Sequence, residues 1–352
     1  MSCYHPMVLI ETSNMCDPEQ RKIVEKLKLI HKQQKSIRSC NTILIPRELA
    51  IDEGIDLRLN KALLVPCGRC IGCRLDYSRE WAIRCMKEVE QYQDNWFLTL
   101  DYDDEHLPVG KKGVPSLRPS DVSSFMKRLR TRLQREIGHV GVRFFACGEY
   151  GDASLRPHLH IILINCPLPD LQERHPIPVD GVVKWIRQYD TNGEKLLYSP
   201  LIGECWTYGR SPLGKVTFES CAYVSRYIVK KQYGEGAEQY QECGVEAPFV
   251  RMSRNPGIGH QWFMENLDRI YEFDNFNIKR GDKVINIKPG KYCDKLLKLQ
   301  DEQLYYDIKK KRHEDFYDGV DCLSYENIDV VINNHKAEAS KKVSIKTLKR
   351  NL

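Results

Sequence analysis

The sequence lacks a long hydrophobic run, a phosphate-binding loop and internal repeats, and each absence argues against a class of protein. No stretch approaches the roughly 20 apolar residues of a membrane helix or the apolar core of a signal peptide, so we expect no membrane partner. No G-x-x-x-x-G-K-S/T motif occurs, which argues against a fused helicase. The excess of positive charge is small, at +6, and favours a nucleic-acid partner only weakly.

Cysteine, in contrast, is abundant, with 14 residues in a chain of 352. Most are scattered, and we expect reduced thiols in a cytoplasm rather than disulfides. Cys67, Cys70 and Cys73 are the exception, because three thiols at C-x-x-C-x-x-C spacing can surround one zinc ion. A turn with free thiols is the alternative, and an iron–sulfur site is a less favoured one. The fourth zinc ligand would come from Cys3, His5, Cys16 or Cys40.

A pair of histidines lies in an apolar segment, residues 157–164, that is rich in β-branched side chains and begins with proline. Such a segment predicts a strand. Because side chains alternate across a strand, His158 and His160 share one face, and Leu159 faces the other way. Two neutral imidazoles placed in this way can bind one divalent ion. The alternative is a pair of hydrogen-bonded or exposed histidines at the end of a strand.

A third ligand is expected from the preceding segment. Residues 142–147 predict another strand, and the glycine, serine and proline of residues 151–157 predict a hairpin connection. Glu149 would then lie beside His158. Two histidines and a carboxylate leave positions on the ion for phosphate oxygens, which suits Mg²⁺ or Mn²⁺. Three nearby carboxylates compete with Glu149 for this position: Asp101, Asp103 and Asp104.

Two tyrosines lie in residues 218–233, which contain no glycine or proline and predict a helix. Tyr223 and Tyr227 are four residues apart, so they lie one turn apart on the same face. Lys230 and Lys231 follow in the next turn. A phenol becomes a useful nucleophile only when it is oriented and its charge is stabilised. The alternative is that both tyrosines are ordinary, half-buried helix residues.

The order of the expected elements predicts an α+β fold. A strand at 95–100 precedes an amphipathic helix at 119–137. The two strands above follow, then a short hairpin within 206–217 and the tyrosine helix. This order matches a split βαβ layout of the ferredoxin or RRM type, an antiparallel sheet with helices on one face. The other face would be free for metal and DNA. We expect further helices at 78–94 and 294–312.

Three regions are expected along the chain. Residues 1–76 form a loop-rich, cysteine-rich zinc element, residues 77–270 a nuclease core with flanking loops, and residues 271–352 a charged, partly helical region. Basic residues cluster on the helix at 119–137, where they would either contact phosphate or form a solvated face. They are Lys127, Arg128, Arg130 and Arg132.

Three motifs together resemble those of the HUH endonuclease superfamily. Further motifs resemble the replication initiators of gokushovirus-type microviruses. The HUH-like motifs are FLTLDYDD at 97–104, GEYG and RPHLHIIL within 148–163, and YVSRYIVKK at 223–231. The microvirus-like motifs are CYHP at 3–6, VPCGRCIGCR at 65–74 and MSRNPGIG at 252–259.

The resemblance implies a rolling-circle initiator that acts on single-stranded DNA and on the double-stranded origin in the cytoplasm of a bacterial host. It implies a nick that leaves a 5′-phosphotyrosyl link and a 3′-OH for the host polymerase, with a host helicase or supercoiling separating the strands. The second tyrosine would help to cut and recircularise the displaced strand. A metal-dependent hydrolase without a covalent intermediate and a non-catalytic, zinc-containing DNA-binding protein remain the alternatives. By resemblance His158, His160 and Glu149 bind the ion, Tyr223 and Tyr227 are nucleophiles, and Lys230 or Lys231 is the assisting cation.

Overall fold

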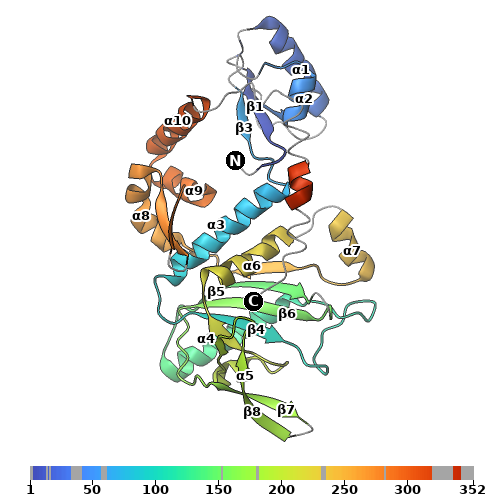
Figure 1. Cartoon of the computed structure of the whole chain (residues 1–352), viewed down its shortest axis with the longest axis vertical. Helices are drawn as coiled ribbons and strands as arrows, with labels where there is room; N and C mark the ends of the chain where they lie inside the picture. Colours follow the sequence, from blue (N-terminus) through green and yellow to red (C-terminus); the bar gives the residue numbers. More distant parts are fainter. Residues whose placement is uncertain are drawn as a thin grey trace. The chain divides into compact units, whose positions relative to one another are not determined.

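The computed structural model divides by its internal contacts into two compact units (Figure 1). Unit 1 comprises residues 1–76 and 306–349, and unit 2 comprises residues 77–305 with the last three residues. The three regions expected from the sequence remain predictions. The structure describes residues 3–12, 15, 17–32, 42–56, 62–151, 154–179, 182–230, 235–280, 283–318 and 336–341.

The centre of unit 2 is a five-stranded sheet in which every pair of neighbouring strands is antiparallel. This confirms the α+β fold with an antiparallel sheet. The two middle strands, β6 and β5, form the expected hairpin. In spatial order the strands are β10 (Leu213–Lys215), β4 (Trp96–Asp101), β6 (Pro157–Ile164), β5 (Arg143–Tyr150) and β11 (Phe249–Met252).

Helices cover both faces of this sheet, and the expectation of helices on one face was therefore wrong. On one face α4 (Pro119–Ile137) and α5 (Pro200–Cys205) pack over inward-facing residues such as Leu159 and Ile161. On the other face α3 (Ile71–Val89) and α6 (Phe218–Lys230) pack over residues such as Ile162. The reason lies in β6, whose residues after the histidines are apolar on both sides and need cover on both sides.

The helix boundaries agree with the sequence in part. The helix at 119–137 is α4 and is confirmed, and the tyrosine helix begins at Phe218 as predicted. The helix expected at 78–94 begins seven residues earlier, at Ile71. The helical region at 294–312 is interrupted at Asp301, which separates α9 (Lys291–Gln300) from α10 (Glu302–Asp318).

Two segments between β6 and α6 differ from the expected structure. The short hairpin within 206–217 does not form; instead β10 adds to the edge of the main sheet by pairing with β4. A connection that looked like a loop forms a second antiparallel sheet from β7 (Arg174–Val179), β8 (Val182–Tyr189) and β9 (Lys195–Leu196). The prolines of β7 hid this strand, because proline is depleted in strands and is tolerated mainly at edges.

The family-like motif at 252–259 packs against α3. Ile258 is fully buried in the core on that face, and its carbonyl accepts a hydrogen bond from Arg84. Gly259 donates its backbone N–H to Glu88 and has a positive φ of +76°. A Cβ at Gly259 would lie 3.0 Å from the Arg84 carbonyl oxygen, so glycine is required there by conformation and by space. The rest of unit 2 consists of α7 (Glu235–Cys243), α8 (His260–Phe273), β12 (Phe276–Arg280), β13 (Lys283–Ile287) and α9.

Unit 1 is not loop-rich, contrary to expectation. Its core is a three-stranded antiparallel sheet with β1 in the middle, and residues such as Val8, Ile43 and Leu27 are buried between the sheet and its helices. The strands escaped notice because each contains at most five residues. The elements are β1 (Met7–Glu11), β2 (Thr42–Pro46), β3 (Leu63–Val65), α1 (Pro18–Lys32) and α2 (Arg47–Asp52). Of the helices in the described residues, none has the length and apolar character to cross a membrane.

Candidate active site and cysteine cluster

The hairpin of β5 and β6 brings two histidines and a glutamate together. Glu149 lies directly opposite His158 in the strand register, and His160 follows two residues later on the same face. Nε2 of His158 and Nε2 of His160 each lie 3.1 Å from the same atom, Oε1 of Glu149. The ligand atoms of these three residues lie within 4.8 Å of one another, so they could hold one metal ion. The structure therefore assembles the three predicted residues.

The protonation states of these groups suit metal binding. Burial disfavours the Glu149 carboxylate, but hydrogen bonds from His158 and His160 outweigh burial and lower its pKa to about 2. Burial lowers the pKa of His160. Burial acts in the same direction on His158, but its hydrogen bond to Glu149 raises the pKa overall. At neutral pH the carboxylate is therefore ionised and His160 is neutral, and these are the forms that bind metal.

Each imidazole is oriented through its second nitrogen. Nδ1 of His158 lies 3.2 Å from the backbone oxygen of Arg156. Because a carbonyl oxygen only accepts, Nδ1 of His158 donates and Nε2 carries the lone pair. Nδ1 of His160 lies 3.0 Å from the hydroxyl of Thr99, and the His160 ring stacks on Phe97. These contacts from β4 resemble the outer partners that orient metal-binding histidines. The sequence analysis missed the contact made by Thr99, although its alternation with Phe97 was visible.

The three aspartates that compete with Glu149 in the sequence have other partners. Asp101 pairs with Arg210 at 2.8 Å, Asp103 bonds to His106, and Asp104 pairs with Arg156 at 2.6 Å. None of the three belongs to the group of potential metal ligands found with the histidines among the described residues.

Tyr223 points from α6 into the same group. Its side chain is 7% exposed, and its hydroxyl donates a hydrogen bond of 2.5 Å to Oε1 of Glu149. The ring also meets His160 edge-on, with centroids 5.0 Å apart. Tyr227 and Lys230 follow on the same helix, but their side chains are outside the described part, as is the whole of Lys231. The structure thus brings one of the two predicted tyrosines to the histidines.

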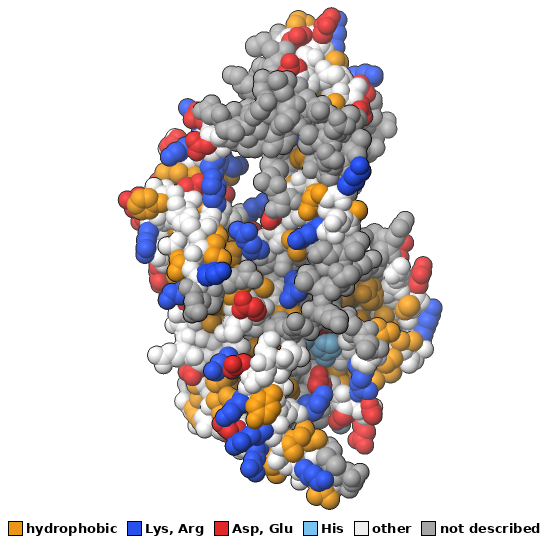
Figure 2. All heavy atoms as spheres, viewed as in Figure 1, with side chains coloured by type: hydrophobic (Ala, Val, Ile, Leu, Met, Phe, Trp, Pro, Cys, Tyr) orange, Lys and Arg blue, Asp and Glu red, His pale blue; other side chains and the backbone are white. Residues whose placement is uncertain are grey.

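The basic residues of α4 mainly make local contacts. Arg128 and Arg130 donate to the backbone oxygens of Cys205 and Val142, and Arg132 pairs with two glutamates. These contacts favour a role of the arginines in fixing α4. On the face shown in Figure 2, Lys and Arg side chains are interspersed with Asp and Glu rather than gathered in one patch.

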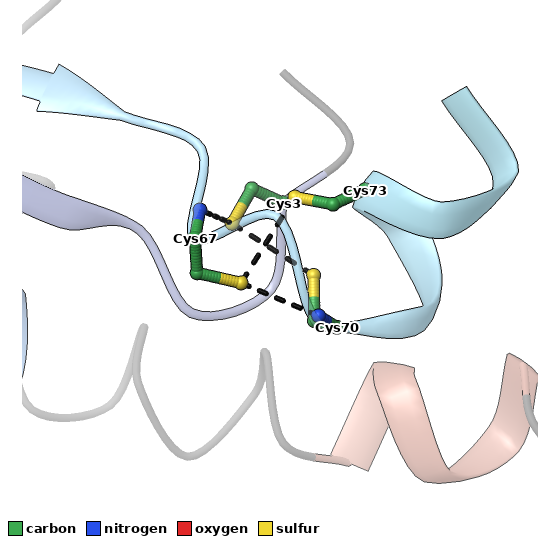
Figure 3. A group of neighbouring side chains, drawn as sticks. All are labelled: Cys3, Cys67, Cys70 and Cys73. Atoms are coloured by element: carbon green, nitrogen blue, oxygen red, sulfur yellow. Dashed lines mark hydrogen bonds between the residues drawn. The ribbon is translucent and has the colours of Figure 1, made fainter. Parts of the chain in front are cut away.

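In unit 1 the predicted cysteines meet a fourth (Figure 3). The sulfurs of Cys3, Cys67, Cys70 and Cys73 lie within 4.8 Å of one another, with 3.8 Å between Cys3 and Cys70 and 4.0 Å between Cys67 and Cys73. Of the other candidates for a fourth ligand, His5 pairs with Glu338 instead. Cys16 and Cys40 lie outside the described residues.

The four thiols differ in acidity. Burial raises the pKa of Cys3 to about 11 and also raises that of Cys73. Burial acts on Cys70 too, but hydrogen bonds from the backbone N–H groups of Cys73 and Tyr4 outweigh it and lower the pKa to about 7. All cysteines in the described residues are free, as expected, and the sulfur separations are far longer than the roughly 2.05 Å of a disulfide.

Comparisons with known proteins agree with this picture. Residues 95–232, which include the histidines and tyrosines, match the family described as Replication-associated protein ORF2. The chain is 35% identical over 252 residues to the replication-associated protein ORF2 of Spiroplasma virus 4, covering 71% of this chain and 73% of that protein. It is 36% identical over 201 residues to the replication-associated protein VP4 of Bdellovibrio phage phiMH2K, covering 56% of each chain.

A third relative, the replication-associated protein ORF4 of Chlamydia phage 1, is 28% identical over 167 residues, covering 47% of this chain and 38% of that protein. No solved structure matches the chain. The extent of the match to the Spiroplasma virus protein, together with the match over residues 95–232, shows that this chain belongs to the family of phage replication-associated proteins of the ORF2 type.

Proposed function

We propose that this replication-associated protein is a metal-dependent nicking and joining enzyme of the HUH type that starts rolling-circle replication. One observation carries the proposal: the hydroxyl of Tyr223 and the Nε2 atoms of His158 and His160 all contact a single atom, Oε1 of Glu149. A nucleophile and a metal-binding group are thereby concentrated at one point, as a covalent mechanism requires.

The three side chains fit a small divalent ion. Two imidazoles and one carboxylate form a facial set that leaves positions for phosphate oxygens, which suits Mg²⁺ or Mn²⁺. The ion, when bound, would polarise the scissile phosphodiester as a Lewis acid. Thr99 and the Arg156 carbonyl hold the two rings in the orientation that presents Nε2 to the ion.

Tyr223 is the residue that we assign to the attack. Its phenol oxygen forms a bond to phosphorus, the bond from phosphorus to the 3′ oxygen breaks, and the phenol proton ends on that oxygen. The products are a 5′-phosphotyrosyl link and a free 3′-OH for the host polymerase. With a pKa of about 2, Glu149 is a weak base, so we assign it to orientation of the phenol rather than to removal of its proton. Lys230 or Lys231 would stabilise the developing negative charge.

Tyr227 is the second nucleophile in this proposal. It lies one helical turn from Tyr223, about 5–6 Å away, on the same helix face. One tyrosine can hold the 5′ end of the displaced strand while the other attacks the regenerated origin. The phosphotyrosyl link conserves the energy of the phosphodiester bond, so religation needs no nucleotide. We expect this cycle to run in the cytoplasm of the bacterial host with a host helicase to separate the strands.

Two alternatives differ in what remains on the DNA. A metal-dependent hydrolase would use the same histidines to activate water and would leave no protein on the 5′ end. A non-catalytic DNA-binding protein would leave the DNA uncut. The hydrogen bond of Tyr223 to Glu149 favours the covalent mechanism, because a hydrolase has no need of a phenol at this point.

The test is the formation of a covalent adduct. Full-length protein is incubated with Mn²⁺ and labelled single-stranded oligonucleotides that tile the replicon encoding this chain, then separated by denaturing electrophoresis. We expect a labelled band at the mass of protein plus DNA. The Tyr223→Phe, Tyr227→Phe double variant should form no adduct, and the exposed Tyr189→Phe variant serves as the matched control. An adduct formed by the double variant, or cut DNA without any adduct, would contradict the proposal.

A further inference from the structure

The two N-terminal family-like motifs meet at one point in the fold. CYHP contributes Cys3 from the segment before β1, and VPCGRCIGCR contributes Cys67, Cys70 and Cys73 from the turn between β3 and α3. More than 60 residues of sequence separate them. In Figure 3 the four sulfurs converge on a common centre. Such convergence of four thiols from two distant segments is unexpected for residues that only fill space.

The spacing of the sulfurs fits a single tetrahedral ion. A metal–sulfur bond of about 2.3 Å implies edges of about 3.8 Å in a regular tetrahedron. The sulfurs of Cys3 and Cys70 lie 3.8 Å apart, and those of Cys67 and Cys73 lie 4.0 Å apart. A disulfide requires about 2.05 Å. A multi-iron cluster would occupy the space between its ligands and hold their sulfurs further apart. Four thiolates at tetrahedral spacing suit zinc.

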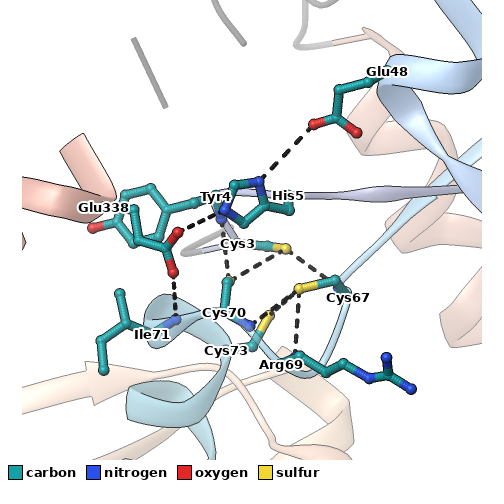
Figure 4. Close-up of polar contacts among 10 residues, drawn as sticks. All are labelled: Cys3, Tyr4, His5, Glu48, Cys67, Arg69, Cys70, Ile71, Cys73 and Glu338. Carbon is teal, nitrogen blue, oxygen red and sulfur yellow. Dashed lines mark hydrogen bonds and ion pairs between the residues drawn. The ribbon is translucent and has the colours of Figure 1, made fainter. Parts of the chain in front are cut away.

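Backbone N–H groups point at the sulfurs, as they do around thiolates (Figure 4). Cys67 Sγ accepts from the N–H groups of Arg69 and Cys70, at 3.4 and 3.3 Å. Cys3 Sγ accepts from the N–H of Cys67, and Cys70 Sγ accepts from that of Tyr4. Gly68, at φ +75°, allows the tight turn that aims these groups inward. Hydrogen bonds of this kind stabilise the negative charge that metal ligands carry.

We propose that Cys3, Cys67, Cys70 and Cys73 bind one zinc ion as four thiolates, and that this ion fastens the start of the chain to the first turn of α3. All four positions of the ion are filled by protein, so the site is structural rather than catalytic. It is independent of the nicking mechanism proposed above, because none of its ligands belongs to the group at Glu149.

A second contact closes the same corner of unit 1. The carboxylate of Glu338, 6% exposed, accepts a hydrogen bond of 3.0 Å from the N–H of Ile71, the first residue of α3. Its other oxygen lies 2.6 Å from Nε2 of His5. The helix of residues 336–341 therefore holds the segments on both sides of the cysteines (Figure 4). Zinc and Glu338 together tie the segment before β1 and the start of α3 to a helix near residue 340.

The experiment measures bound metal in the full-length protein, purified under reducing conditions without added metal and analysed by elemental mass spectrometry. We expect about one zinc per chain, and about one zinc released when a mercurial blocks the thiols. Cobalt(II) exchanged into the site should give the charge-transfer and d–d bands of tetrahedral thiolate coordination. The Cys3→Ser and Cys70→Ser variants should lose the zinc, whereas Cys243→Ser, which alters an exposed thiol outside the cluster, should keep it.

Two results would overturn the proposal. The first is wild-type protein without zinc that takes up neither zinc nor cobalt(II), or that carries iron with visible absorption instead. The second is a Cys3→Ser variant with undiminished zinc and an unaltered cobalt spectrum, which would remove Cys3 from the ligand set. Should the variants fail to fold, zinc content and cobalt spectra of the wild type still decide between these outcomes. Adduct formation is a separate measurement, so failure here leaves the nicking mechanism untouched.

Discussion

The histidine group of unit 2 and the cysteine cluster of unit 1 are built in opposite ways. The histidine group lies on neighbouring strands, and the register of one hairpin fixes Glu149 opposite His158. The cysteine cluster joins a tight turn to Cys3, which lies far away in sequence. One set mixes nitrogen with oxygen and contains three residues; the other consists of four sulfurs. The first set suits exchange of a weakly held ion with substrate oxygens, and the second suits permanent retention of a soft ion.

The largest expected effect is on the histidine group. Replacement of His158 and His160 by Ala should lower adduct formation by at least about 100-fold, because loss of an outer partner alone already costs 10–100-fold at metal sites. Zinc bound to unit 1 should stay unchanged, since the cysteines are separate from the histidines. Denaturing electrophoresis and elemental analysis of the same preparation measure both quantities.

DNA binding provides the control for this double variant. Binding depends mainly on phosphate contacts, so the affinity for single-stranded DNA, measured by fluorescence anisotropy, should change little. Adduct formation at the wild-type rate in the double Ala variant would show that the ion is held elsewhere. A joint loss of zinc and nicking would contradict the separation of the two sites.

The contrast between the sites also explains what the sequence could predict. His158, His160 and Glu149 were predicted because strand alternation and a hairpin connection are local rules, and the register followed from them. Cys3 was only one of four candidates for the fourth ligand, because no local rule relates it to Cys67. The contact of Glu338 with Ile71 was missed entirely, since a carboxylate near the end of the chain carries no pattern that points to a helix start.

The same reasoning applies to the fold. The helix at 119–137 and the strands of the histidine hairpin have clear periods and were predicted well. The second layer of helices was missed, although Ile162 and Ile164 alternate with Ile161 and Leu163 and make β6 apolar on both faces. A strand of this kind is buried on both sides, and attention to its second face would have predicted cover by α3 and α6.

A smaller effect is expected at Thr99. Replacement by Val removes the hydroxyl that contacts Nδ1 of His160 and keeps the shape of the side chain. Metal affinity should fall about 10–100-fold, seen as a higher Mn²⁺ concentration for half-maximal adduct formation, with the yield recovered at saturating Mn²⁺. Thr99→Ser restores the hydroxyl and should restore the affinity. An equal loss in both variants would indicate a packing effect instead of orientation of His160.

The pH dependence of the metal-free protein tests the electrostatics of Glu149. Its pKa is lowered from 4.5 to about 2, so its contribution to stability is fully present above pH 4.5 and is lost as the pH falls towards 2. That contribution is on the order of 3 kcal/mol. The free energy of unfolding in urea should therefore fall more steeply over this interval in the wild type than in Glu149→Gln. Parallel curves would mean that the histidines do not stabilise the carboxylate.

The smallest effect is expected at Glu338, beside the cysteine cluster. Glu338→Ala removes the acceptor of the Ile71 N–H and the partner of His5, while the four sulfurs remain. The free energy of local opening at the start of α3, measured by hydrogen exchange of the Ile71 amide, should drop by about 1–3 kcal/mol, the cost of leaving one buried group unsatisfied. Zinc content should stay at the wild-type level. The exposed Lys341→Ala variant in the same helix should leave both measurements unchanged. Loss of zinc in Glu338→Ala would mean that the carboxylate is needed to assemble the thiolates; unchanged exchange would mean that the four sulfurs alone hold the start of α3.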